Sequence, residues 1–246
     1  MASVKAMMGC IGIPIHVSVS VLSDFFGFFR GRVPDDADPN VIARVSLLGL
    51  MNSLQGKHIH LNVIRVGIDN FTDDEIDKID YAIYRIRNIY KQVSIGVGRV
   101  QHWNVTSEDA DGKDDIGSKS EATELTHDWT VPNNGQDAFI VDNISAEDFA
   151  GISNINGPCN KNAMSRNGFV LEVDLDSEKF ARAFAHEVGH YLGLKHTHGK
   201  ECSDSDADKH NLMSQSRCAI SLRDSVVLTS EQGSTMRSHC SVQDGC

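Results

Sequence analysis

The feature that most constrains this chain is the run from His186 to His196, which has the spacing H-E-x-x-H-x-x-G-x-x-H. Residues four apart lie on one face of an α-helix, so His186 and His190 can direct two imidazole rings to the same point. Gly193 permits the left-handed backbone that ends a helix, and the resulting turn brings His196 round to join them. Three imidazoles leave the fourth position of a tetrahedral zinc ion open, which is typical of a catalytic site.

Two further residues extend this pattern. Glu187 follows the first histidine, and beside a metal it can take a proton from a water molecule and pass it to a leaving amine. Met213 lies in the segment Asn211-Leu212-Met213-Ser214, which resembles the Met-turn that underlies the zinc-binding histidines of metzincins. The two motifs together resemble the signature of the metzincin zinc metalloproteases.

The resemblance implies a fold and an activity. The expected fold is α+β, with a twisted mixed β-sheet backed by helices and the zinc helix at the floor of the cleft, over about residues 58 to 240. The expected activity is hydrolysis of peptide bonds by an endopeptidase with one zinc ion. The substrate would lie extended against an edge strand and pair with it through backbone hydrogen bonds. The residues expected to contact it are Gly151, Ile152, Ser153, Ser214 and Gln215.

The branch of the family stays open. Some metzincins place a tyrosine ligand two residues after the methionine of the Met-turn, where this chain has Gln215, so it does not resemble the astacin or serralysin branches. Thr197 is nearest to the serine that follows the third histidine in matrixins. The cysteine content and the Gly-x-Ser edge strand resemble pappalysin-like enzymes.

Two alternatives to an active peptidase remain. One is a non-catalytic protein-binding module that keeps zinc as a staple, although a structural site has no use for the Glu187 carboxylate. The other is a latent zymogen in which residues 1–57 cover the site and Cys10 supplies a thiolate to the zinc, as in matrixin and pappalysin-type zymogens. The sequence around Cys10 does not match the matrixin switch, and a disulfide is the usual fate of a cysteine in an even set.

Composition excludes some classes of partner. The chain of 246 residues has 34 acidic against 23 basic side chains, a formal charge of -11, which argues against nucleic acid and anionic membranes. No apolar run is long enough to span a membrane. A polypeptide substrate is the expected partner, a protein inhibitor is a second candidate, and the oligomeric state is left open.

The cysteines bear on the compartment. Six cysteines without a C-x-x-C pair indicate disulfides and an extracellular or secreted protein. Cys202 and Cys218 bracket the Met-turn and form one candidate pair; Cys240 and Cys246 form another. Residues 1–22 make a poor signal peptide, because glycines and Pro14 interrupt their apolar stretch. Either an export signal has been removed, or the protein leaves the cell by another route, or it stays inside.

Hydrophobic periodicity predicts the elements of a domain over residues 58–246, preceded by an N-terminal extension over residues 1–57. The extension contains an apolar Phe25–Phe29 cluster and a predicted helix over Val41–Leu54, which favour an integral segment over a removable pro-segment. The predicted elements of the domain are strands at 58–66, 95–105, 138–144, 151–155 and 169–175, a helix opened by a capping box at Thr72–Glu75, the zinc helix capped by Ser177, and a last helix opened at Thr229–Gln232. The polar stretch Ser107–Asn134 is predicted to be a surface insertion.

Two acidic stretches suggest calcium. Asp204, Asp206 and Asp208 alternate as in a calcium loop, but the loop lacks the glycine at its sixth position and has Gln215 at its twelfth. The stretch Asp109–Asp115 is equally ambiguous. A solvated acidic loop is the favoured interpretation of both, with calcium as the alternative.

Overall fold

The computed structural model describes residues 56–146, 151–161, 166–173, 176–198, 202, 204–215, 217–219 and 221–245. The predictions for Cys10, Phe25–Phe29, Val41–Leu54 and Cys246 lie outside these residues, so the proposed division at residue 57 stays a prediction. None of the described helices combines the length and apolarity that a membrane crossing requires. The elements are β1 (Lys57–Val66), η1 (Ile68–Asn70), α5 (Asp73–Tyr90), η2 (Lys91–Val93), β2 (Ile95–Val105), α6 (Ser107–Ala110), α7 (Lys119–Asp128), β3 (Gln136–Val141), β4 (Gly151–Ile152), β5 (Gly168–Glu172), α8 (Ser177–Tyr191), α9 (Asp206–Lys209) and α10 (Ser230–Arg237).

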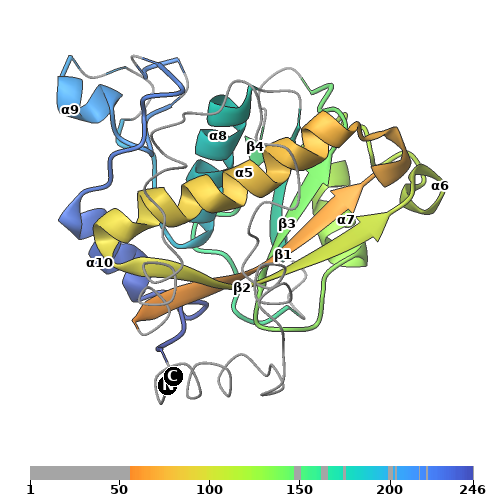
Figure 1. Ribbon diagram of the computed structural model, residues 1–246, viewed down its shortest axis with the longest axis horizontal. Helices are drawn as coiled ribbons and strands as arrows, with labels where there is room; N and C mark the ends of the chain where they lie inside the picture. The colour runs from red at the N-terminus through yellow and green to blue at the C-terminus, as the bar shows by residue number, and fades with distance from the viewer. Residues whose placement is uncertain are drawn as a thin grey trace.

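The five strands form one mixed sheet in the order β2-β1-β3-β5-β4 (Figure 1). β1 pairs in parallel with β2 and β3, and β3 pairs in parallel with β5. β4 is antiparallel to β5, with Gly151 opposite Leu171 and Ile152 opposite Val170. The predicted α+β class with a mixed sheet is confirmed, and the edge strand expected near residue 151 is present, although it is only two residues long.

Two helices, α5 and α8, cover one face of the sheet and pack against each other (Figure 1). The predicted capping box opens α5: the Thr72 hydroxyl accepts from the Glu75 N–H, and the Glu75 carboxylate accepts from the Thr72 N–H at 2.7 Å. The apolar side of α5 is buried against the sheet and α8, and the Tyr90 hydroxyl donates to the Ala185 carbonyl at 2.7 Å. α5 therefore fixes the position of the helix that carries the histidines.

The opposite face of the sheet is covered by α7, which Figure 1 shows behind the strands. Ala122 and Leu125 of α7 are fully buried and pack with Ile116 and Phe139 in a second apolar cluster. The prediction that Ser107–Asn134 is a surface insertion was therefore wrong for this helix. Most of α7 faces water and is polar, and only a narrow stripe of it is apolar. Its composition therefore resembles that of a surface loop.

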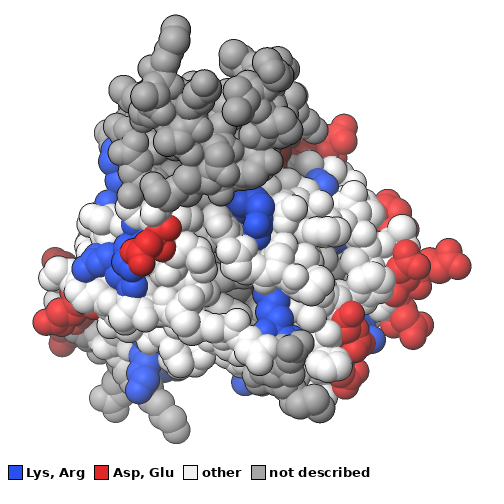
Figure 2. Space-filling view, turned by 90° about the horizontal axis from the view of Figure 1, so that it is seen from below, with Lys and Arg blue, Asp and Glu red and all other residues white. Residues whose placement is uncertain are grey.

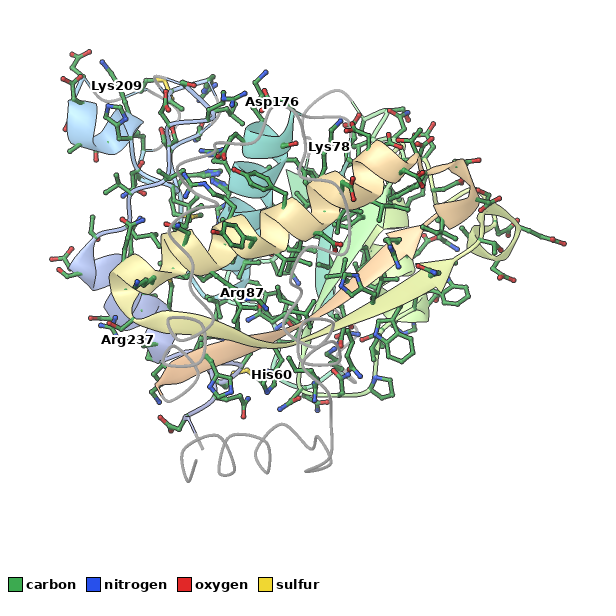
Figure 3. The ribbon with its side chains drawn as sticks, in the orientation of Figure 1. His60, Lys78, Arg87, Asp176, Lys209 and Arg237 are labelled. Atoms are coloured by element: carbon green, nitrogen blue, oxygen red, sulfur yellow. A yellow bond between two sulfur atoms is a disulfide. The ribbon has the colours of Figure 1, made fainter. Side chains whose placement is uncertain are left out.

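A β-bulge in β2 lies opposite His60 of β1. Ile59 pairs with Val97 but Leu61 pairs with Val100, so Gly98 and Arg99 both oppose His60. The extra residue of a β-bulge has no partner in the ladder of backbone hydrogen bonds. Here the Arg99 N–H donates instead to Nδ1 of His60 at 3.0 Å. Figure 3 shows His60 below the strands, on the side away from α5. Burial, together with the charges of His58 and Arg99, lowers the pKa of His60 to about 4.

The lowered pKa of His60 predicts that the stability of the folded chain depends on pH. The pKa of His60 is lower in the folded chain than its ordinary value of 6.5, so the unfolded chain binds the proton more tightly. The contribution of His60 to stability is complete above pH 6.5 and is lost as the pH falls towards 4. His60→Asn keeps an acceptor for the Arg99 N–H but does not titrate. Between pH 7 and pH 4 the free energy of unfolding should fall for both proteins, and we expect the fall to be about 1–2 kcal/mol smaller for the variant than for the wild type.

The measurement is urea unfolding at a series of pH values, with zinc held constant. His127→Asn is the control, because His127 lies on the exposed side of α7. Parallel stability curves for the wild type and His60→Asn across this range would contradict the prediction.

Two disulfides join described cysteines. Cys202–Cys218 confirms the predicted bridge beside the Met-turn. Cys240 pairs with Cys159, so the prediction that it pairs with Cys246 was wrong. The bridge Cys159–Cys240 connects the segment after β4 to the end of α10, two regions that are 81 residues apart in the sequence. Only the packing of the chain brings them together.

Candidate metal centre

The zinc helix of the sequence pattern is α8, and its start is set by Asp176. The Asp176 carboxylate accepts a hydrogen bond from the Lys179 N–H at 2.9 Å, so Asp176 is the N-cap. The prediction of Ser177 as the cap was wrong by one residue, because Ser177 already has a helical position. Figure 3 shows Asp176 at the upper end of α8.

The other end of α8 is set by Gly193, with a φ of 96° in the left-handed region. The Leu194 N–H donates to the Gly189 carbonyl and the Gly193 N–H to the His190 carbonyl, both at 2.9 Å. This is the Schellman pattern that the glycine predicted. The reversal turns the chain at residue 193 and carries His196 back towards His190.

The three histidines of the pattern converge. Nε2 of His196 lies 3.2 Å from Nε2 of His186 and 3.2 Å from Nε2 of His190. The Nδ1 atoms of His186 and His190 lie 2.7 Å from the carbonyl oxygens of Leu212 and Leu194. A carbonyl oxygen can only accept, so these Nδ1 atoms carry the protons and both Nε2 atoms are unprotonated.

This donor set fits a zinc ion. Unprotonated Nε2 atoms cannot donate hydrogen bonds to one another, and their lone pairs repel unless a cation lies between them. A tetrahedral ion with bonds of about 2.0–2.1 Å holds its nitrogen ligands about 3.3 Å apart, close to the separations here. Burial, followed by the charge of Arg182, lowers the pKa of His186 and His196, while burial lowers that of His190 to about 4. Neutral imidazole is the form that binds metal.

Glu187 lies next to this centre. Its side chain is buried, and within the part of the chain that the structure describes its Oε2 atom has no hydrogen-bond partner. Burial raises the pKa of Glu187 to about 8, and the guanidinium groups of Arg182 and Arg166 oppose that shift. An unpartnered buried carboxylate oxygen is unusual and indicates a group kept free for another molecule.

Met213 lies directly against the zinc helix. The side chain is fully buried, and a Cβ atom at Gly189 would come within 2.8 Å of the Met213 sulfur. The thioether therefore fills space that only a glycine in α8 leaves free. The Met213 carbonyl accepts from the Thr197 N–H at 3.1 Å, which connects the Met-turn to the residue after His196.

The residues expected to contact substrate are divided between two places. Gly151 lies beside Glu187, since a Cβ atom at position 151 would be 3.1 Å from the Glu187 Cγ and Oε1 atoms. Ile152 and Ser153 follow it and are partly exposed. Ser214 is fully buried, and the Gln215 side chain lies 3.4 Å from the His198 carbonyl oxygen to which it donates. Their contact with a substrate stays a prediction.

The described residues give no support for a calcium site in either acidic stretch. Among the described residues, metal-ligand atoms come within 4.8 Å of one another in the three histidines and in Cys159, His239 and Cys240, whose cysteines form the disulfide. Neither acidic stretch contributes to such a group. Figure 2 shows Asp and Glu side chains gathering at the right-hand edge, where α6 lies, and Glu108, Asp109, Asp111 and Asp115 are exposed there. This agrees with the interpretation of Asp109–Asp115 as a solvated acidic segment.

Sequence reasoning missed the residues that support the site. The N–H groups of Asn156 and Gly157 donate to the carbonyls of His190 and Tyr191 at the end of α8. Arg182 lies one turn before His186 and is 2% exposed. Its spacing of four from the first histidine was a signal in the sequence, since it puts an arginine on the same helical face as the imidazoles.

Two family models match the chain. The model described as Metallo-peptidase family M12B Reprolysin-like matches residues 76–197, and the model described as Pregnancy-associated plasma protein-A matches residues 156–239. The first covers β2, β3, β4 and β5 and the three histidines; the second covers the histidines, the Met-turn and α10. No curated protein matches the chain in sequence.

Three solved structures are similar to parts of this chain. Metalloproteinase-II from Bacteroides fragilis is similar with a TM-score of 0.50 and 15% identity, over 75% of this chain and 53% of that one. Archaemetzincin from Methanopyrus kandleri has a TM-score of 0.47 and 16% identity, over 74% of this chain and 95% of that one. A chaperone–substrate complex matches with a TM-score of 0.49 and 12% identity, over 74% of this chain and 34% of that chain.

This chain thus spans about a third of the chain in that complex and about half of metalloproteinase-II. At such low identity, the likeness to metalloproteinase-II is evidence of fold alone. The histidine motif, the Met-turn and the two family matches together support a metzincin-like zinc metalloprotease.

Proposed function

We propose that the chain is a zinc-dependent endopeptidase. The observation that carries the proposal is the convergence of three imidazole Nε2 atoms, two of them unprotonated, next to the buried Glu187 carboxylate, whose Oε2 atom has no hydrogen-bond partner among the described residues. His186, His190 and His196 would hold the zinc ion, and a water molecule would complete its ligands. When bound, zinc lowers the pKa of a water molecule and polarises a carbonyl oxygen.

In this proposal Glu187 moves the proton. Its carboxylate accepts a proton from the attacking water and then donates it to the nitrogen of the leaving amine. Burial disfavours the ionised form of Glu187, whereas the charges of Arg182 and Arg166 favour it. The hydrogen bonds from Nδ1 of His186 and His190 to backbone carbonyls keep both rings in the ligand tautomer.

The substrate in this proposal is an extended polypeptide. Among the described residues, β4 pairs only with β5, so its outer side offers backbone groups to a further strand. Gly151 places this edge beside Glu187, and an added strand there would present its peptide bonds to the metal centre. An extended substrate paired with this edge would continue on both sides of the metal centre, which would suit cleavage within a chain and favours an endopeptidase over an enzyme that removes terminal residues.

The alternatives are less well supported. A structural zinc staple does not explain a buried carboxylate without a partner beside the ligands. The latent form depends on Cys10, which lies outside the described residues. Two disulfides suit an oxidising, extracellular location, which we include in the proposal.

The test combines metal analysis with peptide digestion. Purified protein loaded with zinc is expected to hold one ion per chain and to cleave a library of peptides blocked at both ends, as detected by mass spectrometry. A chelator should stop cleavage, and added zinc should restore it. Failure to retain zinc, a fourth protein ligand in the active form, or release of terminal residues alone from unblocked peptides would contradict the proposal.

A further inference from the structure

Arg182 is a buried cation beside the metal centre, and the proposed mechanism does not use its hydrogen bonds. It lies on α8, and the series Glu178, Arg182, His186 and His190 repeats every four residues along one side of that helix. The residue is 2% exposed, and its Nε atom has no hydrogen-bond partner among the residues described. A buried guanidinium is costly unless its contacts compensate for the loss of water, so its remaining contacts show what it stabilises.

Those contacts are made with the Met-turn. Nη2 of Arg182 donates to the Leu212 carbonyl at 3.2 Å and to the Ser214 carbonyl. The two carbonyls flank Met213, so a single side chain holds the turn on both sides of the methionine. Hydrogen bonds from a charged donor are stronger than those between neutral groups.

The Leu212 carbonyl also accepts from His186. Nδ1 of His186 lies 2.7 Å from this oxygen, which therefore receives both the ligand histidine and Arg182. The Met213 carbonyl accepts from the Thr197 N–H, next to His196. The three successive carbonyls of residues 212–214 thus contact Arg182, the first ligand, or the residue after the third ligand.

We propose that Arg182 is a positioning residue, which fixes the carbonyls of the Met-turn and through Leu212 sets the tautomer and angle of the His186 ring. The proposal rests on the proposed zinc site. The other side of the turn is already fixed, because the Asn211 side chain accepts from the Met213 N–H and is paired with Gln232 of α10. Arg182 supplies the missing restraint on the carbonyl side. Groups that orient a ligand in this way typically change metal affinity by about 10- to 100-fold.

Arginine suits this role better than lysine. Its planar fork directs N–H groups to two acceptors at fixed angles, whereas an ammonium is a compact charge on a flexible stem. Arg182→Lys should therefore preserve the charge but restrain the turn less well. Arg182→Met should keep the volume of the stem and remove both hydrogen bonds.

The experiment compares these variants with Arg85→Met. Arg85 also stabilises α8, but it does so from α5, through an ion pair from its Nε atom to Glu178 Oε2 at 3.1 Å, two helical turns before His186. Zinc dissociation constants are measured by chelator competition, unfolding by calorimetry, and ligand geometry by the absorption spectrum after cobalt substitution. We expect Arg182→Met to weaken zinc binding by about 10- to 100-fold and alter the cobalt spectrum. Arg182→Lys should be intermediate, and Arg85→Met should lower the melting temperature without changing zinc affinity.

Several outcomes separate this proposal from the proposed function. Wild-type zinc affinity and an unchanged cobalt spectrum in Arg182→Met would overturn the positioning role, even if the wild type cleaves peptides. Weakened zinc binding in a protein that cleaves no peptide would support the positioning role and contradict the function. If Arg182→Met does not fold, Arg182→Lys carries the test, and unchanged zinc affinity in that variant overturns the proposal. A wild type that binds no zinc overturns both.

Discussion

Glu187→Ala is expected to abolish hydrolysis in an ordinary peptide assay while the protein keeps its zinc. The substitution removes the proposed base and none of the three histidines. General acid–base catalysis contributes about 100- to 10,000-fold, so kcat/KM should fall by that factor. Because a buried carboxylate without a partner is replaced by a small apolar group, the folded state should not be weakened. The measurement is kcat/KM on a blocked peptide, together with zinc content and melting temperature.

The matched control is Glu178→Gln. Glu178 is a second buried glutamate of α8, but it accepts hydrogen bonds from Tyr81 and Arg85 of α5, away from the imidazoles. It should lose stability and retain turnover, the reverse of Glu187→Ala. Wild-type turnover in Glu187→Ala would remove this residue from the mechanism, and loss of zinc would show that it supports the ligands instead.

Phe184→Ala should cause the largest loss of stability. Phe184 lies on α8, is fully buried, and has its ring centre 5.6 Å from that of Phe169 and 6.1 Å from that of Phe180. Truncating a buried phenylalanine costs about 3–5 kcal/mol through lost burial and the cavity left behind. For a domain of this size each kcal/mol lowers the melting temperature by roughly 2–4 °C, so a fall of about 6–20 °C is expected.

The prediction is checked by calorimetry with saturating zinc, so that metal binding does not vary between variants. Phe184→Leu is the control, because a hydrophobic side chain of intermediate size should cost less than about 1.5 kcal/mol if the core repacks. Equal melting temperatures for Phe184→Ala and the wild type would show that α8 does not depend on this aromatic cluster.

The sequence by itself determined what short spacings can specify. The pair His186 and His190 share a helical face by their separation alone, and Gly193 marks the turn because only its backbone adopts a φ of 96° without strain. The capping boxes that open α5 and α10 were predicted correctly, because each joins residues three apart. Alternation of apolar and polar residues located β1, because this pattern too involves only residues that are close together in the sequence.

Tertiary structure decided whatever depends on residues distant in the chain. Cys159 and Cys240 become neighbours only when the segment after β4 packs beside the end of α10. α7 is buried along a narrow apolar stripe, and only the packing of this stripe against the second face of the sheet shows that it belongs to the core. Arg182 reaches the Leu212 carbonyl only because the Met-turn folds back beneath α8. Spacing in the sequence puts Arg182 and the histidines on one helical face, but the carbonyls that Arg182 and His186 contact lie 26 to 32 residues further along the chain and are brought there only by packing.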